Sequence, residues 1–278
     1  MIGCMAHCRV LVQSPRLLGL ALLAAVLGSC NMHRGGTLPG HASNEWTRNY
    51  AIPANGQFQI VGDGGTIDVQ GTTGSTIDVK AERVVRAATD AMAESMVSRV
   101  RISEDVAPDK IVLRSEGLGG VTVGVDIAVN FHVTVPVGIA LRLHSANGDI
   151  TVANVDGALV ASSTNGSIIG KALRGGVDAR ATNGSVTIDL ASVSKDPVDV
   201  RATNGAIELS VPPTANANIE ANCTNGSVDF GDLPLEMTGE QTKRRTRGRL
   251  NEGGAPIELT TINGNIRLHA STTSSVVH

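Results

Sequence analysis

Aromatic side chains are scarce in this sequence of 278 residues, which holds one tryptophan, one tyrosine and three phenylalanines. Aromatic rings are the platforms on which sugars and nucleic acid bases stack, so such platforms are hard to build here. The formal net charge is −3. Because nucleic acid binding needs a basic surface, we expect no nucleic acid partner.

Long apolar runs are also missing. The longest, residues 17–27, is too short for a transmembrane helix, which needs about 20 apolar residues. Arg9 and Arg16 precede this run, and the small residues Gly28 and Ser29 follow it. A basic start, a short apolar run and small residues are typical of a secretory signal peptide, which we predict over residues 1–29.

The signal peptide ends in Leu27-Gly28-Ser29-Cys30, which resembles a lipobox. Small residues at such a site let a peptidase cleave before a diacylated cysteine, so we predict lipid at Cys30. An ordinary cleaved signal peptide is the alternative. Asn31 stands where an aspartate would retain a lipoprotein at the inner membrane. We therefore expect an exported protein anchored to a membrane by lipid, at the outer membrane or facing the periplasm.

Apart from the predicted lipid at Cys30, the cysteines provide no covalent cross-link. Cys4 and Cys8 leave with the signal peptide and Cys30 carries lipid, so Cys223 is the last cysteine of the mature chain. An intramolecular disulfide is thereby excluded. We expect the Cys223 thiol to pack in the interior rather than to react.

Composition and periodicity divide the mature chain into four parts. Residues 30–44 are polar, contain glycine and proline, and predict a flexible tether. Residues 45–135 alternate in short runs that predict strands, interrupted by a helix over 87–99, where Ala88, Met92, Met96 and Val100 share one face. Residues 136–270 form a repeat region, and residues 271–278 are a tail.

The repeat region contains six Asn-Gly pairs, whose asparagines are separated by 18, 18, 21, 21 and 38 residues. Internal repeats of this length are typical of solenoids. The asparagines are Asn147, Asn165, Asn183, Asn204, Asn225 and Asn263. We expect them to form a ladder of turns, with the last, doubled interval holding an inserted loop.

Residues at equivalent positions of the repeats form columns of one chemical type. Two residues before each asparagine the side chain is small: Ser145, Ser163, Ala181, Ala202, Cys223 and Thr261. Two residues after each glycine it is branched and apolar: Ile150, Ile168, Val186, Ile207, Val228 and Ile266. Because alternate residues of a strand face the same side, both columns predict an interior. We predict an all-β fold, a parallel β-helix-like solenoid with one short helix.

An antiparallel meander is the alternative fold, because Asn-Gly is also the strongest signal for a two-residue hairpin. The repeat unit Thr-Asn-Gly-x-Ile/Val, together with Gly65 to Val69 and Ile77 to Lys80, resembles a bacterial adhesin-like family of unknown function, the LiaG-like proteins with β-helical repeats. The resemblance covers about residues 45–270. It implies an exported, surface-associated β-rich protein without an assigned reaction.

Two charged sets are candidates for function. Asp178, Asp199 and Glu220 face outward, two residues before Arg180, Arg201 and Asn222. Carboxylates on a solenoid face can serve acid and base catalysis on a polysaccharide, although pairing with the arginines would make them an inert ladder. Ser192 and Lys195 have Ser-x-x-Lys spacing without the companion motifs of that chemistry. Histidines and glycines show no metal or nucleotide pattern, so we expect no cofactor and no metal.

The second set is a basic run in the doubled interval, which we expect in a loop: Lys243, Arg244, Arg245, Arg247 and Arg249. Such a loop can contact anionic lipid, lipopolysaccharide or another envelope protein, or remain merely solvated. The sequence as a whole favours a non-catalytic cell-envelope lipoprotein that acts as a surface binding or scaffold module. An envelope polysaccharide enzyme and an accessory to envelope-stress signalling are the alternatives.

Overall fold

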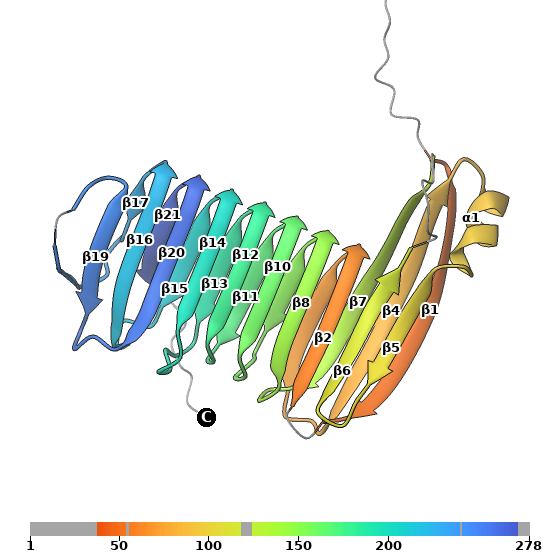
Figure 1. Cartoon of the computed structure of the whole chain (residues 1–278), viewed down its shortest axis with the longest axis horizontal. Helices are drawn as coiled ribbons and strands as arrows, with labels where there is room; N and C mark the ends of the chain where they lie inside the picture. Colours follow the sequence, from red (N-terminus) through yellow and green to blue (C-terminus); the bar gives the residue numbers. More distant parts are fainter. Residues whose placement is uncertain (1–37, 54–55, 118–123, 240, 272–278) are drawn as a thin grey trace, which may run out of the picture. The chain divides into compact units, whose positions relative to one another are not determined.

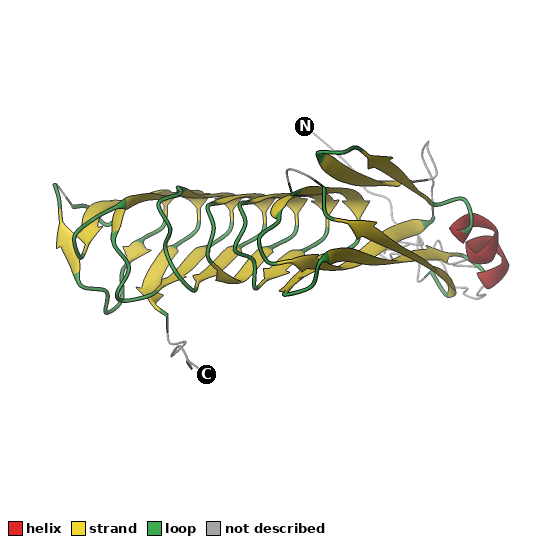
Figure 2. Cartoon of the chain, turned by 90° about the horizontal axis from the view of Figure 1, so that it is seen from below, coloured by secondary structure: helices red, strands yellow, loops and turns green. Residues whose placement is uncertain are grey.

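The computed structural model describes residues 38–53, 56–117, 124–239 and 241–271, which belong to one compact unit. The predicted signal peptide, Cys30, most of the predicted tether and the tail from residue 272 lie outside the described residues. Within them the chain forms two sheets that face each other, and one helix (Figures 1 and 2). No helix in the described part is long and apolar enough to cross a membrane.

The first sheet consists, in spatial order, of β1 (Gly40–Ala51), β4 (Thr76–Ala87), β7 (Asp126–Pro136), β3 (Ile67–Thr72), β9 (Ile150–Ala153), β11 (Ile168–Leu173), β13 (Val186–Leu190), β15 (Ile207–Val211), β21 (Ile266–Ala270) and β17 (Val228–Asp229). The second sheet consists of β18 (Leu235–Met237), β19 (Arg245–Leu250), β16 (Ala217–Asn225), β20 (Ala255–Asn263), β14 (Val198–Asn204), β12 (Val177–Asn183), β10 (Leu159–Asn165), β8 (Ala140–Asn147), β2 (Gln57–Gly64), β6 (Lys110–Glu116) and β5 (Arg101–Val106).

Each repeat makes one coil, with a strand in the second sheet followed by a strand in the first. Neighbouring coils pair in parallel and in register, as in the pairing of β10 with β12 and of β11 with β13. The predicted β-solenoid is therefore confirmed. The meander is wrong for the repeats, because a meander would pair successive strands antiparallel.

The interior columns predicted from the sequence lie between the two sheets. All six members of the small column are buried, with Cys223 the most exposed at 7%. Gly170 faces the interior between Val152 and Ile188 of the neighbouring coils, and Leu173 occupies the space of its missing side chain, because a Cβ on Gly170 would lie 2.7 Å from the Leu173 Cδ1 atom. Val228 is only partly buried, since its coil lies near one end of the stack.

The six asparagines form a continuous amide ladder along one corner of the solenoid. Each side-chain amide donates to the side-chain oxygen of the asparagine in the adjacent coil at 2.8 or 2.9 Å. Asn147, the last in the ladder, donates to the Asp63 backbone oxygen instead. None of these asparagines has a positive φ, so the corner is not the hairpin turn that Asn-Gly usually indicates. The glycine is required because the corners nearly touch: a Cβ on Gly184 would lie 2.1 Å from the Gly166 oxygen.

The order of coils in space differs from their order along the chain. The coil β20–β21 lies between β14–β15 and β16–β17, so Asn263 bridges Asn204 and Asn225. At the other end, β2–β3 lies between β6–β7 and β8–β9. The sequence does not indicate this order, in which the coil β16–β17 leaves a gap beside β14–β15 that the final coil fills.

The first strand begins earlier than predicted. Residues 40–44, assigned to the tether, belong to β1, where Gly40 pairs with Ala87 and Ala42 is buried. The sequence hides this strand because Ala42 is the one apolar side chain among those five residues. These residues form a strand because they pair with β4, not because their own sequence alternates between apolar and polar side chains.

The helix α1 (Asp90–Val97) lies within the predicted range 87–99 and packs on β1 and β4. The Thr89 hydroxyl caps it by accepting a hydrogen bond from the Met92 amide at 3.2 Å. Its buried residues are Ala93 and Val97, whereas Ala88 is exposed. Met92 and Met96 are partly buried against the core and Val100 is fully buried, so three of the four residues of the predicted face do meet the core.

Candidate functional site

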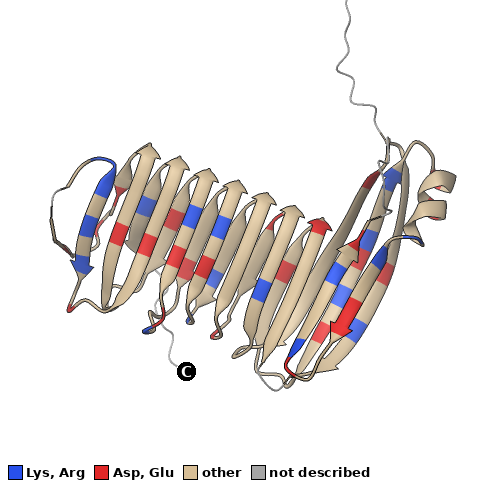
Figure 3. Ribbon diagram, viewed as in Figure 1, with Lys and Arg blue, Asp and Glu red and all other residues tan. Residues whose placement is uncertain are grey.

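The acidic ladder lies on the outer face of the second sheet, in a band of mixed charge (Figure 3). Asp178 is opposite Asp199, as predicted. Glu258 of the inserted strand β20 stands between Asp199 and Glu220, which the sequence order did not reveal. The ladder therefore has four members on adjacent strands instead of three.

The two aspartates of this ladder are paired with the arginines next to them. Asp178 accepts from Arg180 at 2.9 Å, and Asp199 lies 2.8 Å from Arg201 and 3.8 Å from Arg180. The second oxygen of each aspartate is buried and accepts no hydrogen bond from the described residues. Each aspartate therefore uses one oxygen in an ion pair and keeps the other out of contact with solvent.

Only part of the basic run lies in the loop that was expected, because Lys243 and Arg244 precede the strand β19. Arg245, Arg247 and Arg249 lie in β19, an antiparallel strand that pairs with β16. Thr246 and Leu250 alternate with them and are buried, so the strand has an apolar inner side. The sequence does not reveal this strand because three arginines and a glycine mask the alternation.

All three arginines of β19 form ion pairs. Arg245 and Arg247 donate to the Glu220 Oε1 atom at 3.1 and 2.9 Å, and Arg249 pairs with Glu236. Hydrogen bonds from Arg247, then from Asn222 and Arg245, lower the Glu220 pKa from 4.5 to about 2. Glu220 thereby connects the antiparallel strand β19 to the parallel coils.

We predict that Glu220→Gln destabilises the protein near neutral pH and has little effect at pH 2. The folded pKa of Glu220 is below its unfolded value, so its contribution is present above pH 4.5 and is lost as the pH falls toward 2. The side chain is 31% exposed, and solvent screening keeps the contribution near the 0–1 kcal/mol of exposed pairs. Urea denaturation of both proteins at several pH values measures it. A difference that does not depend on pH would contradict the prediction.

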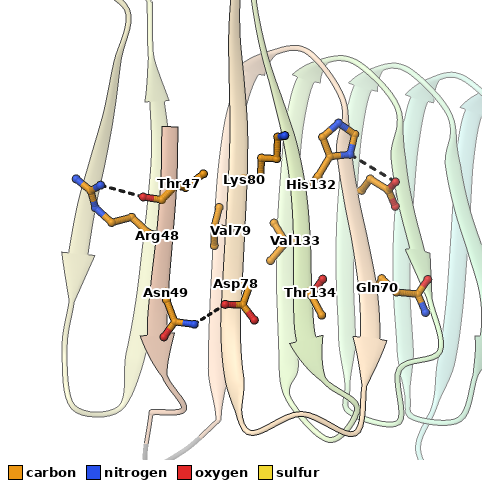
Figure 4. Close-up of a pocket in the computed structure, with 11 residues that line it drawn as sticks. Thr47, Arg48, Asn49, Gln70, Asp78, Val79, Lys80, His132, Val133 and Thr134 are labelled. Atoms are coloured by element: carbon orange, nitrogen blue, oxygen red, sulfur yellow. Dashed lines mark hydrogen bonds and ion pairs between the residues drawn. The ribbon is translucent and has the colours of Figure 1, made fainter. Parts of the chain in front are cut away.

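A separate hollow of about 700 Å³ lies on the outer face of the first sheet (Figure 4). We call it the polar hollow. It is lined by Thr47, Arg48, Asn49, Asp68, Gln70, Asp78, Val79, Lys80, His132, Val133 and Thr134. These residues come from β1, β3, β4 and β7, which are far apart in the sequence. The alternation in Ile67 to Val69 and Ile77 to Lys80 indicates that polar side chains of each strand face outward. It does not indicate that the polar side chains of the four strands lie next to one another.

Neighbouring residues hold the polar side chains of this hollow. Asn49 donates to Asp78, and the Thr76 hydroxyl donates to the other Asp78 oxygen at 3.3 Å. Lys80 pairs with Glu45 at 3.0 Å. His132 Nδ1 lies 3.7 Å from the Asp68 carboxylate (Figure 4).

The remaining candidates from the sequence stay apart from these surfaces. Cys223 is buried, and desolvation raises the pKa of its thiol. Ser192 and Lys195 lie exposed in the connection between β13 and β14. Among the described residues no group of three or more histidine, cysteine, aspartate or glutamate side chains could hold a metal ion.

Fold and surfaces together define a class of protein: a two-sheet β-solenoid with an amide ladder at one corner and polar outer faces. The chain belongs to the Toastrack DUF4097 family, whose model matches residues 57–269. The family resemblance predicted from the sequence is thereby confirmed. No curated protein matches the chain at a significant level.

Several solved structures are similar to the chain. A candidate cell adhesion protein of Clostridium sporogenes ATCC 15579 is 11% identical, with 82% of this chain and 100% of that chain covered and a TM-score of 0.48. A candidate adhesin of Bacteroides fragilis NCTC 9343 is 12% identical, with 82% and 97% covered and a TM-score of 0.28. A candidate lipid-binding protein of Parabacteroides distasonis ATCC 8503 is 11% identical, with 82% and 97% covered and a TM-score of 0.26. At these values the likenesses carry no argument about function.

Proposed function

We propose that this protein is a lipid-anchored, non-catalytic binding module of the cell envelope. The observation that carries the proposal is the pairing of the outward acids Asp178, Asp199 and Glu220 with arginines. A polysaccharide hydrolase needs two carboxyl groups in different protonation states, one of them a proton donor. Paired carboxylates on a regular sheet face suit a rigid recognition surface better than acid and base catalysis.

The anchor follows from the sequence. A basic start, a short apolar run and the lipobox-like Leu27 to Cys30 support lipid attachment at Cys30. Lipid at this cysteine would leave about ten residues before β1 begins at Gly40, which suits a short tether. In this proposal the protein is exported and its solenoid faces the periplasm or the outside of the cell.

The basic strand contributes a smaller part of the proposal. The three arginines of β19 are held in ion pairs with Glu220 and Glu236, which neutralise two of their three charges. Lys243 and Arg244, both exposed, are therefore the cations best placed to contact anionic lipid, lipopolysaccharide or an acidic envelope protein. Contacts of this kind weaken with salt. Binding that is unchanged by salt would exclude a role for these two residues.

We expect Cys30→Ala to release the protein from the membrane without abolishing its binding to envelope material. Fractionation of cells that express the wild type or the variant, with fatty-acid labelling, measures the anchor. Equal labelling of both proteins would contradict lipidation at Cys30.

The purified Cys30→Ala chain is then sedimented with isolated envelope fragments of the native bacterium, and soluble sugar in the supernatant is measured. Saturable co-sedimentation without release of sugar is the expected result. Release of sugar fragments would favour the enzyme, and absence of binding would contradict the binding module.

A further inference from the structure

The polar hollow presents an ordered array of hydrogen-bonding side chains. One row runs Thr47, Lys80, His132 and Asp68, with each residue opposite the next on the neighbouring strand. The second row is Asn49, Asp78, Thr134 and Gln70. Adjacent strands are about 4.8 Å apart. This spacing is close to the length of one sugar unit in a linear polysaccharide.

We propose that the polar hollow binds a neutral, linear polysaccharide that lies across β1, β4, β7 and β3. The inference rests on the proposed function and names its ligand class. A sugar chain in this direction meets a new pair of polar side chains at each strand. The volume of the polar hollow, about 700 Å³, lies within the usual range of about 300–1,000 Å³ for ligand sites.

The residue types suit hydroxyl groups. A sugar hydroxyl both donates and accepts, and the amides Asn49 and Gln70 offer both functions on one planar group. Asp78 accepts, and Thr134 donates or accepts. Because Asp78 is already held by Asn49 and Thr76, and the Gln70 amide donates to the Gly71 oxygen at 3.2 Å, little side-chain entropy is lost on binding.

The charges favour a neutral ligand. Two acids, Asp68 and Asp78, and one cation, Lys80, belong to the two outward rows, whereas Arg48 is opposite the buried Val79, so its side chain lies on the inner side of the sheet. Both cations have partners outside the hollow: Arg48 pairs with Glu104 at 3.1 Å and Lys80 with Glu45 at 3.0 Å. A phosphate or carboxylate ligand would have to compete with these glutamates, whereas a hydroxyl group would not.

The absence of stacking limits the affinity. Trp46 offers no platform in the hollow, because it is partly buried against the core, with the Arg48 guanidinium 4.8 Å from its ring centroid. Because no aromatic residue lines the hollow itself, binding relies on hydrogen bonds, and we expect a Kd of about 1 mM. Many such contacts along one polysaccharide would raise the retention of an envelope-anchored protein.

The test uses the full chain with Cys30→Ala, titrated calorimetrically with maltohexaose, cellohexaose and chitohexaose. At least one of them should bind. Thr134→Ala and Gln70→Ala, both in the hollow, should each weaken that binding about fivefold to tenfold, the effect of one lost hydrogen bond. Thr187→Ala, the same substitution on β13 of the same sheet face, should leave it unchanged.

Two results overturn the proposal. One is the absence of binding to all three sugars at about 10 mM, ten times the expected Kd. The other is equal binding by Thr134→Ala and Thr187→Ala, both shown to be folded by circular dichroism. If the chain still sediments with envelope fragments, and protease treatment of the fragments abolishes this, the binding module stands and its ligand is a protein. Sugar binding without sedimentation would contradict the proposed function instead.

Discussion

A chain that ends after Gly254 should fail to fold cooperatively, because it lacks the coil β20–β21. This coil pairs in parallel on both sides, β20 with β14 and β16, and β21 with β15 and β17. Its removal leaves an internal gap rather than a shorter stack, and breaks the amide ladder between Asn204 and Asn225.

The expected size of this effect follows from burial. Four large apolar side chains of the coil are at most 1% exposed: Ile257, Leu259, Ile266 and Leu268. Each stabilises the fold by about 1.5–3 kcal/mol, so their sum is comparable to the whole stability of a domain, about 5–15 kcal/mol. Urea denaturation followed by far-ultraviolet circular dichroism should show no cooperative transition near that of the full chain.

The control for this truncation is a chain that ends after Ser271, which keeps both strands of the last coil and should unfold like the full chain. The two truncations together separate the loss of the coil from the loss of the C-terminus itself. A cooperative transition at an unchanged urea midpoint in the chain ending at Gly254 would show that β16–β17 can pack directly on β14–β15, and that the order of coils is not required.

The second large effect is expected from Gly184→Ala. The new Cβ would lie 2.1 Å from the Gly166 oxygen and 2.5 Å from its carbonyl carbon, so the backbone of one corner must move. Such movement disturbs the hydrogen bonds of Asn183 with its neighbours at 2.9 Å. We expect a loss of about 3 kcal/mol or more in the free energy of unfolding.

Gly138→Ala is the matched control, since a Cβ there has no atom within 4 Å. It should change the free energy of unfolding by less than about 1 kcal/mol, and can even stabilise the fold by restricting the unfolded chain. Gly184 does not have a φ in the left-handed region, so the contrast measures the close approach of the corners alone. Equal urea midpoints for the two variants would mean that the corners can separate without cost.

The physical reason for the Asn-Gly repeat therefore differs from the usual one. In a hairpin both residues adopt positive φ, whereas here the asparagine side chain bonds to the neighbouring coil and the glycine allows that coil to approach. The dipeptide Asn-Gly is the same in a hairpin and at a solenoid corner. The regular interval of 18 to 21 residues distinguished them, because a hairpin does not require identical columns.

The topology also has a consequence for folding. The coils β2–β3 and β20–β21 each lie between two coils that follow one another in the sequence. The contacts that each of them makes with its neighbours therefore join residues that are distant in sequence. Non-local parallel pairing is slow to form. We therefore infer that the central coils, β8 to β15, form the first stable part and that the terminal coils insert later.

The sequence by itself determined the class of the fold, its interior columns and the asparagine ladder, because the alternation of side chains along a strand and the repeat length are local properties. It also located the helix within a few residues, and its lipobox-like Cys30 motivates the proposed anchor. It failed at Gly40 to Asn44 and at Arg245 to Leu250, where a strand forms through pairing with a neighbour and not through its own hydrophobic pattern.

Only the tertiary structure decided which coils are neighbours, and therefore which charges meet. Glu258 entered the acidic ladder, and Glu220 met Arg247, because strands from distant segments share a sheet. The polar hollow arose in the same way, from four strands whose order in space is not their order in the chain. Lateral pairing depends on the closure of loops and the filling of gaps, which no local pattern of residues encodes.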